Sequence, residues 1–310
     1  MPDRRLFVSF SGGETSAFMT YAILNGAYRR QYDEIAVVFA NTGQERDETL
    51  DFVRECDLHF GFNTVWVEAV VHEGHRRAPT SSVVNYETAD REGRVFEDMI
   101  RKYGIPNSKF KSCTRDLKLR PMTHYLRSIG WEPGSYDTAI GIRIDEIDRI
   151  SAEKHTRRLV YPLVEWIPTT KPEINHWWSQ QPFRLRLKSY EGNCKWCWKK
   201  SFRKHYTLLS ERPEIYDFPD RMEKQYGLVG PEFSKPGLRP GYRRTFFRTG
   251  KSVEDLKAQL ASGISFAPAS DDALAQTPFD PALDVGAGCE ESCEVHAEED
   301  ANVEEDTTHA

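Results

Sequence analysis

The chain contains no apolar run approaching the roughly 20 residues that a membrane-spanning helix needs. Its first residues, MPDRR, also lack the apolar segment of a signal peptide. These absences argue against a membrane partner and predict a soluble, cytoplasmic protein. Thiols stay reduced in that compartment, so clustered cysteines are expected to serve metal binding or redox chemistry and not structural disulfides.

Lysine and arginine are absent from residues 267–310, where thirteen Asp or Glu residues lie. The overall net charge of −6 therefore hides an asymmetry, because residues 1–266 carry a net charge of +7. A basic body suits a nucleotide, a sulfate ester or a nucleic acid, although scattered basic side chains can also simply solvate a surface. The acidic segment is rich in Ala, Pro, Asp and Glu, and this composition predicts little fixed structure.

Two common phosphate-binding motifs, G-x-x-x-x-G-K-[ST] and G-x-G-x-x-G, are missing as well. In their place, the apolar run Leu6 to Phe10 leads into Ser11-Gly-Gly-Glu-Thr-Ser16. This pattern predicts a buried strand, a glycine turn and a helix over about 15–26, capped by Thr15 or Ser16. A glycine turn before a helix N-terminus is an anion site, most often for phosphate. The plain alternative is an ordinary strand-to-helix turn.

The following segments alternate between strand and helix patterns, which predicts an α/β fold with a doubly wound parallel sheet. Ligands of such sheets bind at the carboxyl ends of the strands. Residues 71–94 show no clear period and are expected to form a substrate lid or a mobile surface insertion. The expected strands cover residues 34–41, 64–70 and 136–142. The expected helices cover residues 47–60, 95–103, a stretch ending near 129, 171–181, 198–226 and 251–261. The helical segment 198–226 is expected to break at Arg212-Pro213.

The chain divides by composition into three parts. Residues 1–165 are expected to form the nucleotide-binding α/β domain. Residues 166–266 are expected to form a helical, basic region, and residues 267–310 a largely disordered acidic tail.

Cysteines occur at positions that suit metal chemistry. Cys113 is expected just before a helix, where the helix dipole and nearby basic residues favour a thiolate. Cys194 and Cys197 form a C-x-x-C in a basic, aromatic turn. We rank an Fe–S cluster shared with Cys113 first, a zinc site second and a dithiol redox pair third.

The remaining cysteines differ in setting. Cys289 and Cys293 lie in the acidic segment and are expected to reach back to the metal site or to act as mobile thiols. Their acidic neighbours raise a thiol pKa, which argues against a spontaneously activated nucleophile. Cys56, inside an amphipathic helix pattern, is expected in the core.

A charged segment follows the strand expected at 136–142. Arg143 and Arg149 suit bidentate contact with an oxyanion. Asp145 and Glu146 suit Mg²⁺ held against phosphate oxygens. The alternative for this segment is an exposed helix start of mixed charge.

Four segments, taken in order, resemble the phosphoadenosine phosphosulfate (PAPS) reductase family of the PP-loop adenine nucleotide α-hydrolase superfamily. Ser11-Gly-Gly-Glu-Thr-Ser16 is similar to the PP-loop, and Asn41-Thr-Gly-Gln-Glu45 to the loop after the second strand. Cys113-Thr-Arg-Asp-Leu-Lys118 and Gly141-Ile-Arg143 are similar to the two later segments. The resemblance covers about residues 5–205.

The resemblance implies an adenine nucleotide, ATP or PAPS, with Mg²⁺. Arg143 and Lys118 would stabilise charge that develops on phosphate. Cys113, Cys194 and Cys197 would hold a [4Fe–4S] cluster, with zinc as the alternative and Cys289 or Cys293 as a fourth ligand or acceptor thiol. Pyrophosphate would be held by Ser9, Ser11, Gly12, Gly13, Thr15 and Ser16, and the nucleoside would face Asn41, Thr42 and Glu45.

The sequence also departs from the family pattern. Thr15 stands where the PP-loop more typically carries Asp. The Glu-Cys-Gly-Leu/Ile-His tail of PAPS reductases is absent, and Cys293-Glu-Val-His296 is only faintly similar to it. The paired Cys-Cys of cluster-bearing reductases is missing, because Cys113 is single. A three-cysteine site, as in sulfur-transfer relatives, would leave one iron open to bind sulfide.

We therefore predict an enzyme that converts ATP to AMP and pyrophosphate and activates an acceptor for Fe–S-dependent sulfur transfer. The second enzyme hypothesis is a PAPS reductase in which Cys293 attacks the sulfonate. Two non-enzymatic hypotheses are a nucleotide- or nucleic-acid-binding protein without turnover and a zinc-stabilised interaction module. The expected partners are a nucleic-acid acceptor and a sulfur- or electron-donor protein, and an oligomer is compatible with this function.

Overall fold

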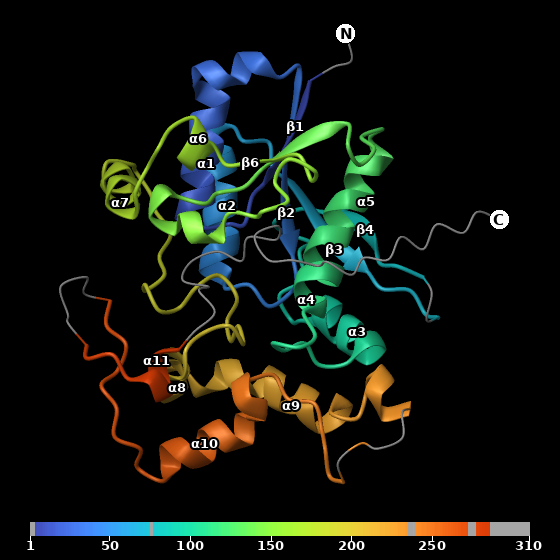
Figure 1. Ribbon diagram of the computed structural model, residues 1–310, viewed down its shortest axis with the longest axis vertical. Coiled ribbons are helices and arrows are strands. Elements are labelled where there is room, and N and C mark those ends of the chain that lie inside the picture. Colours follow the sequence, from blue (N-terminus) through green and yellow to red (C-terminus); the bar gives the residue numbers. More distant parts are fainter. Residues whose placement is uncertain (1–3, 75–76, 235–237, 239, 272–276, 286–310) are drawn as a thin grey trace.

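The computed structural model describes residues 4–74, 77–234, 238, 240–271 and 277–285. Its centre is a six-stranded sheet with the strand order β4-β3-β2-β1-β5-β6 (Figure 1). The described part contains no helix that is both long and apolar enough to span a bilayer. The strands are β1 (Arg5–Ser9), β2 (Glu34–Asn41), β3 (Val65–Val70), β4 (Thr80–Val84), β5 (Tyr136–Ala139) and β6 (Leu159–Val160).

The strands predicted near residues 6–10, 34–41 and 64–70 are confirmed within one residue, and the strand predicted at 136–142 is shorter. The prediction of a wholly parallel sheet is wrong at one edge. Residues 80–84, predicted as part of a loop, form β4 and pair antiparallel with β3. The sequence of this strand shows little alternation of apolar and polar residues. It lies at the edge of the sheet, where the Val83 side chain is exposed. Its antiparallel pairing with β3, the strand just before it in the sequence, and not its own pattern, makes it a strand. The fold is therefore a mixed α/β fold with a mostly parallel sheet.

Helices cover both faces of the sheet. Side chains alternate between the faces of a strand, so Leu6 and Val8 of β1 contact one layer of helices while Phe7 contacts the other. The first layer contains α1 (Glu14–Asn25), α2 (Asp47–Phe60) and α7 (Lys171–Ser179). The opposite face is covered by α5 (Arg120–Ser128). The short helix α6 (Pro162–Glu165) follows β6.

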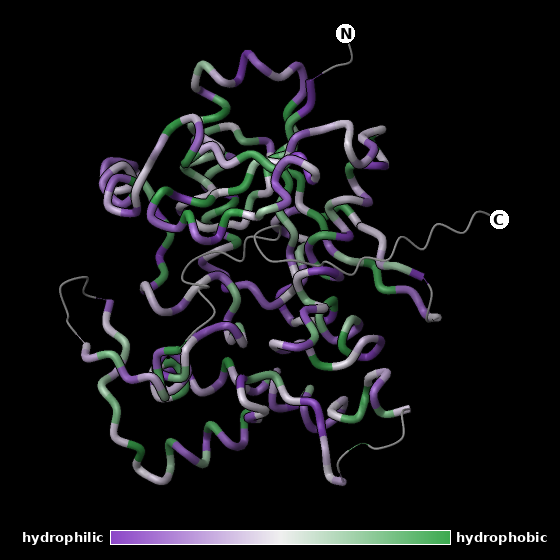
Figure 2. The backbone as a smooth tube through the Cα atoms, in the orientation of Figure 1, coloured by the Kyte–Doolittle hydropathy of each residue, from purple (hydrophilic) through white to green (hydrophobic). Residues whose placement is uncertain are grey.

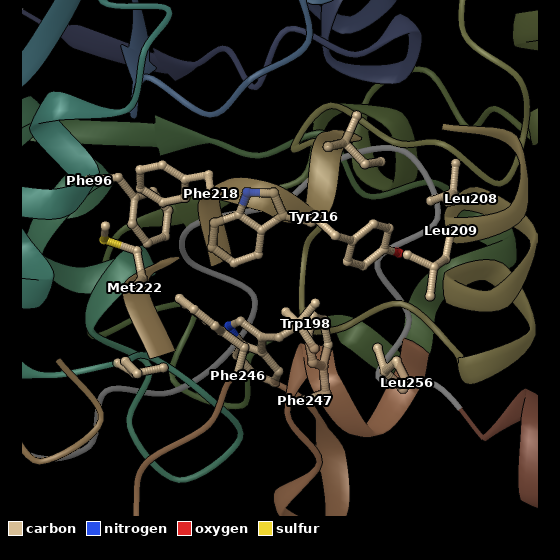
Figure 3. Packing of buried hydrophobic residues seen from close by; sticks show 14 of the residues in the cluster. Phe96, Trp198, Leu208, Leu209, Tyr216, Phe218, Met222, Phe246, Phe247 and Leu256 are labelled. Atoms are coloured by element: carbon tan, nitrogen blue, oxygen red, sulfur yellow. The ribbon is translucent and has the colours of Figure 1, made fainter. Parts of the chain in front are cut away.

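Residues after about 190 build a second apolar cluster below the sheet in the view of Figure 1. Figure 3 shows its aromatic centre, in which Phe96 and Phe218 lie side by side and pack edge to face. Phe96 belongs to α3 (Arg94–Tyr103), so this cluster is joined to the α/β part. Figure 2 shows hydrophobic segments in both the sheet and these helices. The helices are α8 (Phe202–Glu211), α9 (Asp217–Tyr226), α10 (Val253–Ala261) and α11 (Pro281–Asp284).

The helix predicted from about residue 198 begins later, at Phe202, because Ser201 caps it by accepting the Lys204 amide N–H. The predicted break at Arg212-Pro213 separates α8 from α9. Composition predicts little structure beyond residue 266, but residues 281–284 form α11. Asp284 there accepts a bidentate hydrogen bond from the buried Arg203 of α8. Arg203 also donates to the carbonyls of Ala267 and Pro278, so several tertiary contacts hold a segment whose composition alone predicts disorder.

Candidate functional site

The turn after β1 requires its first glycine. Gly12 has φ +79°, and a Cβ there would lie 2.8 Å from Cγ2 of Thr49. Any other residue would therefore be strained and would clash. The N-cap of α1 is Gly13, so the prediction that Thr15 or Ser16 caps the helix is wrong. Gly13 has no side chain to bond the first N–H groups of α1, which lack intrahelical partners. The turn thus has the form of an anion site.

Hydroxyl groups form hydrogen bonds within this turn. The Ser16 hydroxyl donates to the Gly13 carbonyl at 3.0 Å and lies 2.8 Å from the Ser11 hydroxyl oxygen. Ser9, at the end of β1, is buried beside them. The structure therefore brings the six residues predicted to hold pyrophosphate into one turn, with Ser11 and Ser16 already hydrogen-bonded to each other.

Arg143 links this turn to the segment that follows β5. Its guanidinium donates to the Thr15 hydroxyl at 3.1 Å and forms ion pairs with Asp145 at 3.0 Å and Glu146 at 3.2 Å. β1 lies between β2 and β5, and the chain changes direction across the sheet at this point. Open α/β sheets bind ligands at such a switch point. The positively charged guanidinium of Arg143 is therefore buried at the N-terminus of α1, where an anion would bind.

Asp145 and Glu146 lie in a 3₁₀ turn, Ile144–Arg149, beside Arg143. Burial alone would raise the pKa of Asp145, but hydrogen bonds and the charge of Arg143 lower it. Asp145 is therefore ionised at neutral pH and offers oxygen atoms of the kind that Mg²⁺ prefers. Arg149 pairs with Glu146 at 2.5 Å.

The loop after β2 forms a second buried polar group. Glu45 accepts hydrogen bonds from the Thr42 amide at 2.8 Å and the Thr42 hydroxyl at 2.7 Å. Its other carboxylate oxygen has no hydrogen bond among the described residues and lies 3.7 Å from the ammonium of Lys118. Asn41 donates to the Glu68 carboxylate at 2.6 Å, and burial raises the pKa of Glu68. Lys118 comes from a π-helical turn, Arg115–Leu119, so this contact joins two of the predicted motifs.

The C-x-x-C segment packs directly on both loops. Asn193 donates from its side-chain amide to the Ser11 carbonyl at 2.9 Å. Lys195 donates its backbone N–H to the Gln44 carbonyl at 3.0 Å, and the Trp196 indole N–H donates to the Gln44 side chain at 2.6 Å. Cys194 forms a backbone bridge with Glu45. Sequence reasoning missed Gln44, Asn193 and Trp196, although each adjoins a predicted site residue.

Cys194 and Cys197 are hydrogen-bonded to each other. This bond, followed by burial, raises the pKa of the Cys194 thiol. Cys113 lies within a short helix, α4 (Ser112–Thr114), not before a helix as predicted, and packs against the apolar cluster that contains Trp196 and Trp198. Cys56 is buried in α2 as expected.

Two of the four predicted metal ligands, Cys194 and Cys197, are thus in contact. Asp145, another of the four, forms an ion pair with Arg143. Among the described residues, no group of three or more His, Cys, Asp or Glu side chains is placed to hold a metal ion. Cys194 and Cys197 fit two ligand positions of a thiolate-bound metal, provided that metal binding displaces the protons of the two thiols. Cys289 and Cys293 lie outside the described residues.

Comparison with known proteins finds relatives that are themselves uncharacterized, and no family model matches the chain. The chain is 24% identical over 245 residues to the uncharacterized protein MJ0066 of Methanocaldococcus jannaschii, over 75% of this chain and 45% of that protein. It is 26% identical over 119 residues to MJ0973 of the same organism, over 38% and 22% of the two chains. A third comparison extends over nearly the whole length, with 31% identity over 297 residues, 93% of this chain and 94% of its relative. On that similarity, the chain belongs to the family of the uncharacterized nin region protein ORF290 of Escherichia phage lambda.

Proposed function

We propose that the protein is a PP-loop enzyme of the PAPS reductase type that cleaves ATP to AMP and pyrophosphate and uses the reaction for sulfur transfer. The observation that carries the proposal is the contact between Arg143 and Thr15. It places a buried guanidinium at an uncapped helix start, beside a glycine turn and at the switch point of the sheet. This combination suits a polyphosphate that is cleaved and not merely held.

In this proposal, the backbone N–H groups of residues 12–16 bind the departing pyrophosphate. Arg143 stabilises the negative charge that develops as the acceptor attacks the α-phosphorus and the bond to the bridging oxygen breaks. Lys118, whose ammonium lies 3.7 Å from Glu45, would stabilise phosphate charge from the side of the loop after β2. Glu45 has one carboxylate oxygen without a hydrogen bond among the described residues, which suits a ribose hydroxyl. Asp145 and Glu146 would hold Mg²⁺, which neutralises phosphate charge when bound.

The thiols would supply the sulfur chemistry. Cys194 and Cys197 would supply two ligands of an Fe–S cluster whose chemistry is the transfer of sulfur or electrons, and Cys113, predicted as the third ligand, would have to join them when the cluster binds. Because Cys194 is bridged to Glu45, and Asn193 bonds to Ser11, this pair is attached to both nucleotide loops. Such an arrangement suits a reaction in which an activated acceptor meets a sulfur group.

The nucleotide chemistry is tested by the products formed from ATP. We expect AMP and pyrophosphate in equal amounts, with no ADP, when the purified chain is incubated with ATP and Mg²⁺ and water takes the place of the acceptor in the attack on the α-phosphorus. The products are separated by ion-exchange chromatography. The reason is that a PP-loop directs attack to the α-phosphorus. Formation of ADP and phosphate, or tight ATP binding without any product in the presence of cell extract as acceptor source, would contradict the proposal.

The cluster is tested by anaerobic purification with analysis of iron, sulfide and zinc. We expect about four irons and four sulfides per chain, with the visible absorption of a [4Fe–4S] cluster. Cys194→Ala and Cys197→Ala should each bleach this absorption, whereas Cys56→Ala, which removes a buried core thiol, should leave it intact. One zinc per chain and no iron would rule out the cluster.

A further inference from the structure

A cavity of about 640 Å³ lies beside the start of α1. It is open to solvent on one side and is lined by residues of α1, α7, α8, the connection between the last two helices and residues 269–271. Its volume falls within the range of pockets that bind small molecules. The charged residues that line it are Glu14, Lys171, Arg184, Lys188, Lys204 and Asp271, and Asn193 lines it as well.

Four basic side chains and two acidic ones, Glu14 and Asp271, line this cavity, so its formal charges do not cancel. Arg184 neutralises Glu14 through two hydrogen bonds of 3.0 Å each, and Lys188 pairs with Glu211 at 3.0 Å. Among the described residues, no carboxylate forms an ion pair with the ammonium of the half-buried Lys204. The cavity therefore retains positive charge and attracts an anion.

Asn193 adds an independent sign of a missing ligand. It is only 7% exposed, lines the cavity and is held by the bond from its amide nitrogen to the Ser11 carbonyl. Its amide oxygen is buried and has no hydrogen-bond partner in the described part of the chain. A buried acceptor without a donor is costly, so a ligand group with an N–H or O–H satisfies it. Through the bond to Ser11, Asn193 connects the lining of the cavity to the glycine turn.

We propose that this cavity binds the molecule that the enzyme activates, and that this molecule is a small anion. Its phosphate or carboxylate group lies against Lys204, and a hydroxyl or amino group at its other end donates to Asn193. Only the role of this molecule as the acceptor rests on the proposed function. The anion site itself rests on the cavity, its charge and the buried amide oxygen of Asn193.

The anion site is tested with pyridoxal 5′-phosphate, an aldehyde that carries a phosphate and condenses with lysine amines. After reduction with borohydride, peptide mass spectrometry locates the modified lysines. We expect Lys204 to be modified about tenfold faster than Lys257 of α10, since 1.4 kcal/mol of binding at the site corresponds to that factor. Inorganic phosphate should suppress modification of Lys204 but not of Lys257. Lys257→Ala is the matched control and should leave the labelling of Lys204 unchanged.

The donor end is tested by protection against the same reagent. ω-Aminoalkyl phosphates of increasing chain length should protect Lys204 better than alkyl phosphates of equal length, and Asn193→Leu should remove the difference. Equal rates of modification at Lys204 and Lys257 would overturn the inference. So would complete protection of Lys204 by ATP alone, because the cavity would then belong to the nucleotide. Phosphate-sensitive labelling in a chain that forms no AMP would refute the proposed function and leave the anion site standing.

Discussion

Replacing Arg143 with alanine should lower the rate of AMP and pyrophosphate formation by about 100- to 1,000-fold, the usual loss when one preorganised donor to a developing oxyanion is removed. Arg143 is buried, so its charge acts in a region of low dielectric where water cannot replace it. Its hydrogen bond to Thr15 and its ion pairs with Asp145 and Glu146 fix the guanidinium beforehand. The measurement is the turnover rate at saturating ATP, with thermal unfolding as a check on folding.

Two variants separate the role of Arg143 from the general loss of a charge. Arg143→Lys keeps the charge but loses the planar guanidinium that contacts Thr15, Asp145 and Glu146, so its rate should fall between those of the wild type and the alanine variant. Arg149→Ala removes a neighbouring arginine that also pairs with Glu146, and it should retain most of the activity. An Arg143→Ala enzyme with unchanged turnover would show that Arg143 only orders the loop.

Replacing Trp196 with alanine should reduce the free energy of unfolding by about 3–5 kcal/mol, as for other buried Trp residues. Trp196 is 1% exposed and packs edge-on to Phe96 and Phe246, with ring centroids 5.2 and 4.6 Å away. Its indole also holds Gln44 in the loop after β2. The loss should therefore extend to the site, because Gln44 adjoins Glu45. Urea unfolding and ATP affinity, measured on the same preparation, check both expectations.

Trp196→Phe keeps most of the packing but removes the hydrogen bond to Gln44, so it should cost about 1 kcal/mol for that bond. Trp131→Ala is the matched control, because Trp131 is also buried but packs against Tyr136 in the α5 layer. It should reduce stability to a similar degree without a specific loss of ATP affinity. Equal losses of ATP affinity in the Trp131 and Trp196 variants would show that Trp196 acts only through overall stability.

Local pattern was sufficient for most of the α/β part. The helix predicted at 47–60 is α2 with the same bounds, and the strand predicted at 34–41 is β2. Both are continuous segments whose apolar residues repeat with the period of their own structure. Turn chemistry was informative too, because the strained φ of Gly12 is accessible only to glycine without cost. Cap residues were less informative, since Gly13 and not a hydroxyl residue ends the turn.

By itself, therefore, the sequence determined the alternation of strands and helices, the glycine turn and the order of the charged and cysteine-bearing segments. Only the tertiary structure decided that β4 joins the sheet, that Asp284 orders α11, and that Asn193 and Trp196 close over the loops. For Asp284, Asn193 and Trp196, the physical reason is distance along the chain, whereas residues 80–84 simply lack a strand pattern of their own. Ser11 and Asn193 are 182 residues apart, so their hydrogen bond exists only after the sheet and the helices around it have packed.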